Sequence, residues 1–365
     1  LGLVDWLHEH GCQAVGMEGT GIYWKPMYAI LEGQGFALVL SNAHHIRKVP
    51  GRKTDVSDSQ WIAELLLHGL MKSSFVPPKP IAELRDLVRY RKKLVGARTA
   101  ERNRAQRLLE SANIKLASVL SDVFGVSGMS MLRALLDGEL SAEEMSKLAR
   151  GRARQKQAEL VLALEGRFQE HHRFLLTLQL DRLEQVETDI AKLDARIEER
   201  LAPYAAERKR LQTIAGVDRV ASFQILAEIG VDMSVFDNEA ALASWAGVCP
   251  GSRESAGKNK SGRMRKGNRH LTVALVEAAQ AAIRKKDSYL RAKFHKLKAR
   301  RGYLRALIAV AHKILIAAFH ILRDGVEYRD LGPSYLDQQN EGRIVRGLVN
   351  RLQRLGYQVN VEKPA

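Results

Sequence analysis

The chain has 365 residues, of which 45% are apolar, and its 58 Lys and Arg against 41 Asp and Glu give a formal net charge of +17. The apolar share is enough for two or three domains with buried cores and excludes a mainly disordered chain, while the charge indicates a polyanionic partner, nucleic acid above all. Two cysteines, Cys12 and Cys249, are too few for a disulfide framework or a cysteine zinc site, which fits a cytoplasmic protein. The longest apolar run, 304–322, is interrupted by histidine and lysine, so we expect no membrane span.

The N-terminal part of the chain has an α/β pattern. Residues 13–18 and 36–41 are typical of buried strands, and a helix closed by glycine is expected between them, over 22–35, so the strands should be parallel. A further helix is expected from about Asp55 to His68, and the prolines of "KSSFVPPKP" then break it. We therefore expect a first domain over residues 1–80.

The middle of the chain, residues 81–207, is almost wholly helical in its pattern. Apolar residues recur every seventh position from Leu176 to Ile197, a spacing that favours a coiled-coil arm through which chains associate. The alternative is a long amphipathic helix that packs on its own chain. Gln179 weakens the seam, because it places a polar group at one of its positions.

A third domain is expected over residues 208–335, followed by a C-terminal tail over 336–365. Its first segment, "LQTIAGVDRVASFQILAEIG", resembles a helix-hairpin-helix whose turn amides bind a backbone phosphate. Such hairpins usually have a second glycine where this chain has Asp218, whose charge would repel phosphate. A purely structural hairpin is therefore at least as good an interpretation.

Basic residues are concentrated in this third domain. Between Lys258 and Arg301 there are 15 Lys or Arg against Glu277 and Asp287, which favours contact with phosphates over a merely solvated surface. A weaker basic run covers residues 85–107. The residues that we predict to contact nucleic acid are Arg52, Lys53, Arg253, Lys258, Lys260, Arg263, Arg265, Lys266 and Arg269.

Three carboxylates of the first domain form a candidate metal site. Glu18 ends the first strand and is followed by "GTG", small residues that would let a nucleic-acid backbone approach. Asp55 and Asp58 stand at i and i+3 where a helix begins, so they share one face and could hold Mg²⁺, although in isolation helix capping is the better explanation. The later half of an RNase H-like fold has the same order of elements: a strand ending in an acid, a helix, a second strand and a helix that begins with D-x-x-D.

Three motifs carry a family resemblance that covers nearly the whole chain. "MEGTGIYWKPMYAIL", "NAHHIRKVPGRKTDVSDSQWIAELLLHGLM" and "ASWAGVCPGSRESAGKNKSGRMRKGNRHL", in this order, resemble the IS110 family of insertion-sequence transposases, and more closely its IS1111 subgroup. The resemblance implies a partial RuvC-like (RNase H-like) domain with DEDD carboxylates, a helical coiled-coil middle, and a mostly helical C-terminal transposase domain with a nucleophilic serine.

Residue by residue, Glu18, Asp55 and Asp58 match the second, third and fourth acids of the family's tetrad. The first aspartate has no counterpart in this chain, which opens on an amphipathic helix that runs straight into a strand. We therefore expect that a strand bearing this aspartate precedes Leu1 in the complete protein.

The family motif P-x-x-R-E-S matches Pro250 to Ser255, which favours Ser255 as the nucleophile over Ser252 and Ser261. The resemblance implies that Ser255 attacks a DNA phosphodiester to give a covalent phosphoserine link and a free 3′ end, with divalent ions, Mg²⁺ by expectation, held by the carboxylates. It also implies a guide RNA encoded by the element and a homo-oligomer, a dimer or tetramer, in which one subunit's carboxylates meet another subunit's serine.

Two other functions fit the same residues. A RuvC-like junction nuclease would use the carboxylates and an activated water, without a covalent intermediate. A catalytically dead remnant would still bind nucleic acid through its basic residues, because binding does not need the missing aspartate.

Overall fold

The chain folds into two compact units, Leu1–Pro78 and Lys79–Ala365. The computed structural model describes residues 2–46, 55–249, 254–255, 258–259, 264 and 266–362. Of residues 44–45, 55–57, 254–255 and 258–259 it describes the backbone alone.

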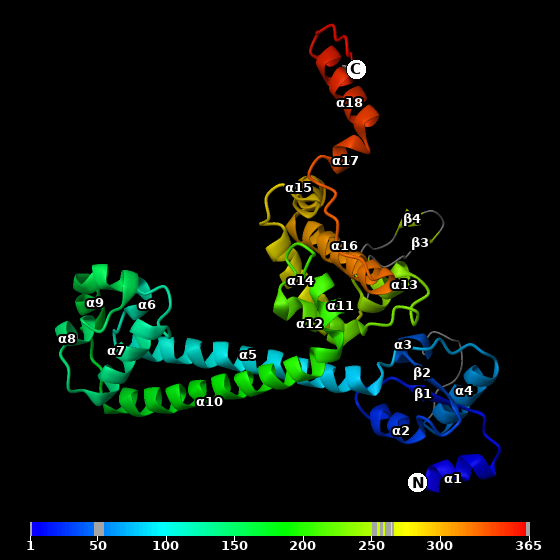
Figure 1. Ribbon diagram of the computed structural model, residues 1–365, viewed down its shortest axis with the longest axis horizontal. Helices are drawn as coiled ribbons and strands as arrows, with labels where there is room; N and C mark the ends of the chain where they lie inside the picture. Colours follow the sequence, from blue (N-terminus) through cyan, green and yellow to red (C-terminus); the bar gives the residue numbers. More distant parts are fainter. Residues whose placement is uncertain are drawn as a thin grey trace. The chain divides into compact units, whose positions relative to one another are not determined.

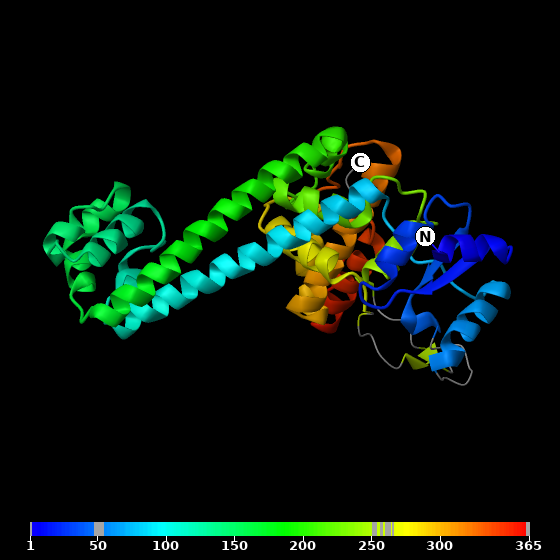
Figure 2. The same ribbon diagram turned by 90° about the horizontal axis from the view of Figure 1, so that it is seen from below.

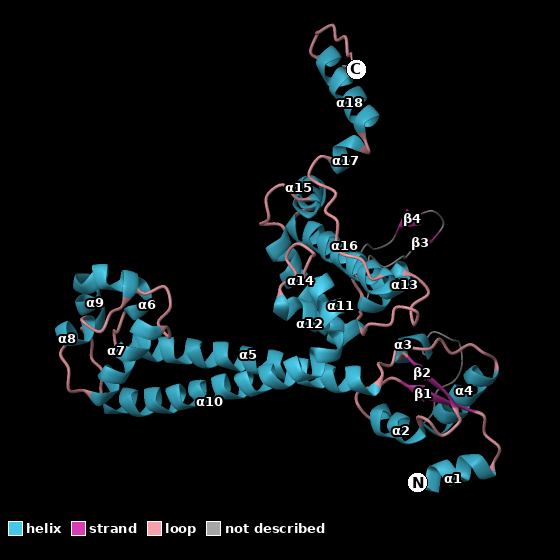
Figure 3. Cartoon of the chain, viewed as in Figure 1, coloured by secondary structure: helices cyan, strands magenta, loops and turns pink. Residues whose placement is uncertain are grey.

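The first unit contains the expected pair of parallel strands (Figures 1 and 3). The register runs from Ala14 opposite Ala37 to Glu18 opposite Ser41. Its elements in chain order are α1 (Gly2–Glu9), β1 (Ala14–Glu18), α2 (Trp24–Leu31), β2 (Ala37–Ser41), α3 (Ala43–Ile46) and α4 (Asp55–Leu67).

Helices cover both faces of this strand pair. Val15 and Met17 of β1 pack with buried residues of α1 and α2, among them Leu31. Successive side chains of a strand point to opposite faces, so Gly16 faces the other way. An added Cβ at Gly16 would lie 3.0 Å from Ile62 Cγ2, which places α4 against that second face. The layering is that of an α/β domain.

The second unit begins with a long helical hairpin. α5 (Lys79–Ser111) and α10 (Glu170–Leu201) lie side by side in both views (Figures 1 and 2). Arg102 Nη2 pairs with Glu187 Oε1 at 3.0 Å, and Arg91 forms two hydrogen bonds with Asp194. These ion pairs join the hairpin along its length.

The heptad seam of α10 is buried within this hairpin. Leu176, Leu183, Ile190 and Ile197 are all buried, and α10 packs on α5 of the same chain. The expectation that this seam joins two chains is therefore wrong for these residues, and the intramolecular alternative holds. Heptad spacing identifies an apolar stripe, but it does not say which helix covers the stripe. Gln179 Oε1 is buried there without a hydrogen-bond partner among the described residues.

A small helical head joins the far ends of α5 and α10. It has a core of its own, in which Met131, Leu132 and Leu160 are fully buried. Gly128 touches the backbone of Val123 so closely that an added Cβ would lie 1.9 Å from its oxygen. The head consists of α6 (Leu116–Val119), α7 (Val126–Asp137), α8 (Ala142–Ser146), a 3-10 turn (Gly151–Lys156) and α9 (Gln157–Leu164).

The rest of the second unit is a helical bundle around α16 (Tyr303–Asp324). Among the described helices α16 alone is long and apolar enough to span a membrane by length and composition, but half of its apolar window is buried in the bundle. Around it lie a 3-10 turn (Ala202–Tyr204), α11 (Ala205–Leu211), α12 (Arg219–Ile229), α13 (Glu239–Ala246), α14 (Arg269–Ala282) and α15 (Tyr289–Arg301). Two strands, β3 (Glu254–Ser255) and β4 (Lys258–Asn259), come between α13 and α14, and α17 (Tyr335–Gln338) and α18 (Glu341–Arg354) follow α16.

The turn between α11 and α12 is packed rather than open to a ligand. Gly216 has φ +85°, and an added Cβ would lie 2.2 Å from the carbonyl oxygen of Ala278 in α14. Asp218 is the N-cap of α12, where its Oδ1 accepts a hydrogen bond from Ala221 N at 2.7 Å. The carboxylate thus occupies the position that a phosphate would take, which favours the structural interpretation of this hairpin.

Gly216→Ala tests this packing. We expect it to lower the free energy of unfolding by about 3 kcal/mol, because strain at positive φ adds to a clash with the α14 backbone. Gly302→Ala is the matched control, since Gly302 has φ +80° and nothing lies within 4 Å of its added Cβ. Urea unfolding of both variants separates the two effects, and equal losses would contradict the packing.

Candidate functional site

Glu18 lies at the carboxyl end of β1, as expected, and it is half-buried. Thr20 Oγ1 donates a hydrogen bond to Glu18 Oε1 at 2.6 Å. Gly19 N donates to the carbonyl oxygen of Ser41 at 2.7 Å, and a Cβ at Gly19 would lie 3.3 Å from that oxygen. The glycine therefore permits a tight exit from the strand, and the threonine orients the carboxylate.

Asp58 lies near the start of α4, on the side of the helix that faces β1. It stands four residues before Ile62, which contacts β1 at Gly16, and residues four apart share a helix face. Glu18 stands two residues after Gly16 and therefore points to the same face of the strand. The structure thus places Glu18 and Asp58 on facing surfaces of the first unit. Asp55 opens α4 as predicted, but its side chain lies outside the described residues.

The chemistry of these acids suits a hard divalent cation. Mg²⁺ takes oxygen ligands and is commonly held by one or two protein carboxylates together with phosphate oxygens and water. Within the described residues no group of three or more His, Cys, Asp or Glu could hold a metal ion. Glu18 and Asp58 supply two carboxylates of this kind, and the side chain of Asp55 lies outside the described residues.

Ser255 lies in a short hairpin of the second unit. The backbone of β3 pairs antiparallel with β4, so that Ser255 stands opposite Lys258 and Glu254 opposite Asn259. A basic residue is thus the cross-strand neighbour of the predicted nucleophile.

Both ends of the segment that carries this hairpin, residues 248–267, are attached to the end of α13. A Cβ at Gly267 would lie 2.4 Å from Ala246 C and from Gly247 N, so only glycine permits this approach. Thr272 Oγ1 donates a hydrogen bond to the carbonyl oxygen of Ala246 at 3.1 Å. The segment therefore leaves and re-enters the bundle at the same place.

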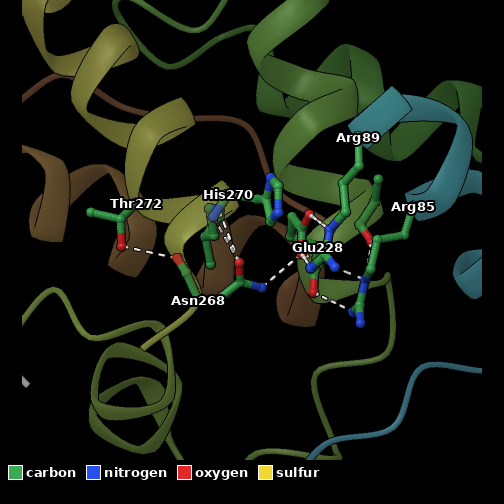
Figure 4. A network of polar contacts seen from close by, with 8 residues as sticks. Arg85, Arg89, Glu228, Asn268, His270 and Thr272 are labelled. Carbon is green, nitrogen blue, oxygen red and sulfur yellow. Dashed lines mark hydrogen bonds and ion pairs between the residues drawn. The ribbon is translucent and has the colours of Figure 1, made fainter. Parts of the chain in front are cut away.

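A buried polar network supports the point of re-entry (Figure 4). Arg89 of α5 binds Glu228 of α12 in a bidentate pair, with Nε to Oε1 and Nη2 to Oε2 both at 2.8 Å. Asn268 Nδ2 donates to the same Oε2 at 2.7 Å. Arg85 donates to the carbonyl oxygens of Ala227, at 3.0 Å, and Glu228, at 2.7 Å. Three helices, α5, α12 and α14, thus meet at one carboxylate.

The charges of this network are balanced in favour of the ionised carboxylate. The Glu228 side chain is 2% exposed, and this burial works to raise its pKa. Hydrogen bonds from Arg89 and Asn268, together with the positive charges of Arg89 and Arg85, outweigh the effect of burial. They hold the pKa of Glu228 below its ordinary value. Burial lowers the pKa of Arg85 to about 10, so Arg85 and the carboxylate are both charged at neutral pH.

A pocket of about 290 Å³ opens beside this network, between α5, α12 and α14. Burial lowers the pKa of His270 on its wall, and Arg89 adds to this effect, so the imidazole is mainly neutral at pH 7. Lys92, also on the wall, pairs with Glu277 at 2.6 Å. The lining residues are Val88, Arg89, Lys92, Gln224, Glu228, Arg269, His270, Val273 and Ala274.

The predicted nucleic-acid contacts are only partly described. Lys266 and Arg269 are exposed at the start of α14, where they are free to meet a phosphate backbone, and the backbone of Lys258 lies in β4. The predicted residues that lie outside the described part of the chain are Arg52, Lys53, Arg253, Lys260, Arg263 and Arg265.

The network around Glu228 was not predicted from the sequence. Glu228 stands in the apolar run "ASFQILAEIG", where a charged residue indicates a buried partner. Arg85 and Arg89 are four residues apart and therefore share a helix face. These signals were present, but the partners are separated by 139 residues in the chain, and spacing alone does not join them.

Glu228→Gln tests the strength of this network. We expect the free energy of unfolding at neutral pH to fall by about 2 kcal/mol, because two arginines lose their anionic partner. The folded-state pKa of Glu228 is below the ordinary 4.5, so its stabilisation is present above 4.5 and is lost as the pH falls through the folded-state pKa. The difference between wild type and variant should therefore shrink in acid.

Urea unfolding at neutral and acidic pH measures both effects. Glu277→Gln is the control, because the Lys92–Glu277 pair is half exposed and contributes little. A wild type and Glu228→Gln variant that differ equally at both pH values would contradict the depressed pKa.

Two family models match the parts of the chain that carry these residues. The DEDD transposase model of the IS110 type, described as "Transposase", matches residues 1–114, which include Glu18 and Asp58. The model described as "Transposase IS116/IS110/IS902 family" matches residues 208–295, which include Ser255 and Glu228. The matched ranges contain both the carboxylate site and the serine hairpin.

Two curated proteins are similar over a large part of the chain. The transposase for insertion sequence element IS1111A of Coxiella burnetii is 26% identical over 314 residues, which are 83% of this chain and 75% of that protein. A probable family 20 transposase of Pseudomonas aeruginosa is 25% identical over 239 residues, which are 65% of this chain and 61% of that protein. With both family models, these similarities show that the chain belongs to the IS110 family of insertion-sequence transposases.

Proposed function

We propose that this transposase moves its own insertion sequence by a covalent reaction in which Ser255 is the nucleophile. The observation that carries the proposal is the serine hairpin: β3 and β4 set Ser255 opposite Lys258, in a segment whose two ends are held at α13. Anchoring both ends of the segment would limit the positions that the Ser255 hydroxyl can take. A nucleophile needs that constraint, since attack on phosphorus is sensitive to alignment.

The proposed step is a transesterification at a DNA phosphodiester. The Ser255 Oγ–P bond forms as the P–O3′ bond breaks, and the proton lost by the hydroxyl is balanced by the proton gained by the 3′ oxygen. The product is a phosphoserine link to the new 5′ end of one strand segment and a free 3′ hydroxyl on the other. Rejoining is the reverse step with another 3′ hydroxyl, so no external energy source is needed.

Cationic residues around the hairpin would offset the negative charge that develops on phosphorus. Lys258 lies opposite Ser255, while Lys266 and Arg269 are exposed where the segment returns to the bundle. Groups that are fixed before the reaction stabilise such charge without reorganising at the moment of attack. The same residues would hold the DNA backbone in a salt-dependent manner.

Glu18, Asp55 and Asp58 would hold Mg²⁺ in the first unit. The bound ion supplies a Lewis acid for the scissile phosphate. Thr20 orients the Glu18 carboxylate, and the packing of α4 on β1 keeps Asp58 on the facing surface. The carboxylates and the serine belong to different compact units, so the reaction needs the two units, from one chain or from two chains of a homo-oligomer, to act on one phosphate.

We also propose that a guide RNA encoded by the element pairs with the donor and target DNA. Support comes from the family to which the chain belongs and from its excess of 17 positive charges. Most of that excess lies in the part of the chain after Lys258, which can bind RNA and DNA backbones alike.

Ser255→Ala is the decisive test of the covalent step. Wild-type protein incubated with Mg²⁺ and DNA of the element ends should give a protein–DNA adduct that survives denaturation, because the phosphoserine bond is covalent. Ser255→Ala should reduce the adduct at least about a thousandfold, and Ser261→Ala, in the same segment, should leave it unchanged. Denaturing gel electrophoresis of labelled DNA measures the adduct.

Cleaved DNA without any adduct would instead identify a junction nuclease that uses water. Binding without cleavage by the full-length protein would identify a nucleic-acid-binding remnant. Either outcome contradicts the serine mechanism.

Asp55→Asn and Asp58→Asn test the carboxylates. We expect each to reduce Mg²⁺-dependent cleavage by the full-length protein at least about a hundredfold, because a neutral amide is a far weaker ligand than a carboxylate. Melting temperature should change little, since both residues lie in the first turn of α4. Glu64→Gln, an exposed change on the same helix, is the control. Full cleavage in Asp55→Asn would return this pair of acids to a capping role.

A further inference from the structure

Asn268 makes two kinds of contact at the start of α14. Its Oδ1 accepts hydrogen bonds from His270 N and Leu271 N, both at 3.1 Å, and so caps the helix. Its Nδ2 donates to Glu228 Oε2 at 2.7 Å. Capping requires only the oxygen, because any Asn, Asp or Ser supplies it. The amide nitrogen therefore has a separate role, which is to join α14 to Glu228.

Glu228 in turn is held by the arm helix α5. Arg89 binds both carboxylate oxygens, and Arg85 binds the backbone carbonyls of Ala227 and Glu228 (Figure 4). The contacts thus run without a gap from α5 through α12 to Asn268. Asn268 directly follows Gly267, the residue at which the serine segment re-enters the bundle.

A buried ion pair of this kind is not explained by stability alone. Apolar residues of similar volume often stabilise a core as well as a buried ion pair, whereas directional hydrogen bonds specify one arrangement. Here the directional bonds converge on one carboxylate from three helices, next to the segment that needs a fixed position.

We infer that Glu228 and Asn268 are positioning residues for the serine segment, holding its C-terminal end in register with the arm helix through the Asn268 Nδ2–Glu228 Oε2 hydrogen bond. In this role they act through the segment and not on the DNA or the reacting atoms themselves. The catalytic consequence of this inference rests on the proposed role of Ser255, while the structural link does not.

Asn268→Asp separates the two contacts of this side chain. Aspartate caps a helix as well as asparagine does, so α14 keeps its N-cap. The variant loses the Nδ2 donor and places a second carboxylate beside Glu228, so the link is broken. Asn238→Asp is the matched control, because Asn238 caps α13 through Ala241 N at 2.9 Å, is exposed, and has no carboxylate partner in the described part of the chain.

Two measurements follow the link. The first is the single-turnover rate of Ser255 adduct formation with element-end DNA, together with the Kd for that DNA. We expect Asn268→Asp to lower the rate at least about tenfold, since small misplacements of a nucleophile slow attack strongly, while Kd stays within about twofold. Asn238→Asp should change neither quantity.

The second measurement is amide hydrogen exchange in peptides from β3 to the start of α14, without DNA. We expect faster exchange there in Asn268→Asp than in wild type or Asn238→Asp, because the anchor of the segment is lost. This readout does not depend on the chemistry. If wild type forms no adduct on Ser255 but Asn268→Asp still speeds exchange, the proposed function fails and the positioning role stands.

Glu228→Gln/Asn268→Asp provides the rescue. It exchanges donor and acceptor: the amide nitrogen at 228 would donate to the carboxylate at 268, and Arg89 Nη2, which donates to Glu228 Oε2 in the wild type, would donate to that carboxylate instead. The double variant should recover both the slow exchange and a larger part of the adduct rate than Asn268→Asp alone. Unchanged exchange and unchanged adduct rate in Asn268→Asp, or a double variant that is additively worse, would overturn the inference.

Discussion

The arrangement of the second unit depends on one buried carboxylate. Glu228 has an ionised side chain in an apolar helix, which is tolerable only because Arg89 binds both of its oxygens and Asn268 binds one of them again. That requirement ties α5, α12 and α14 together at a single point. The serine segment departs and returns next to this point, so the electrostatic demand of one side chain fixes where α14 begins after that segment.

In the first unit the close contacts depend on glycines, which have no side chain. Gly16 lets α4 lie directly on β1, and Gly19 lets the chain turn sharply after Glu18. Both glycines serve the same end, because they bring a strand terminus and a helix start to facing surfaces. One unit thus uses close packing around its carboxylates, and the other joins α5, α12 and α14 by hydrogen bonds to a charged group.

The elements that carry a periodic pattern could be predicted from the sequence. Runs of apolar residues predict β1 and β2, because buried strand faces need apolar side chains. The helix expected between the two strands predicts their parallel order, which the structure has. The D-x-x-D start of α4 was also predictable, whereas the helix ends at Leu67, well before the prolines, and Pro80 lies in the first turn of α5. Ser255 was proposed from a motif, and its backbone lies in a hairpin that the Gly-rich and Ser-rich composition does not specify.

What the sequence did not reveal are pairings between distant residues. The heptad stripe of α10 is covered by α5. Glu228 is bound by arginines that lie 139 and 143 positions earlier in the chain. Local spacing in the sequence identifies neither α5 as the partner of α10 nor the arginines as the partners of Glu228. From the sequence, Asp218 is a residue whose charge would repel a phosphate at the hairpin. In the structure its carboxylate caps α12. In each case the side chain contacts either a residue far away in the sequence or a nearby backbone amide. The pattern of residue types along the sequence does not specify which of these partners it binds.

The long helix α5 connects the helical bundle to the helical head. Its 33 residues form a rod of about 50 Å, and Arg85 and Arg89 sit near one end of it while the helical head is joined to the other. A rod that is clamped near one end converts a sideways push at its far end into torque at the clamp. A molecule that binds the head would therefore apply torque to the contacts that Arg85 and Arg89 make with α12.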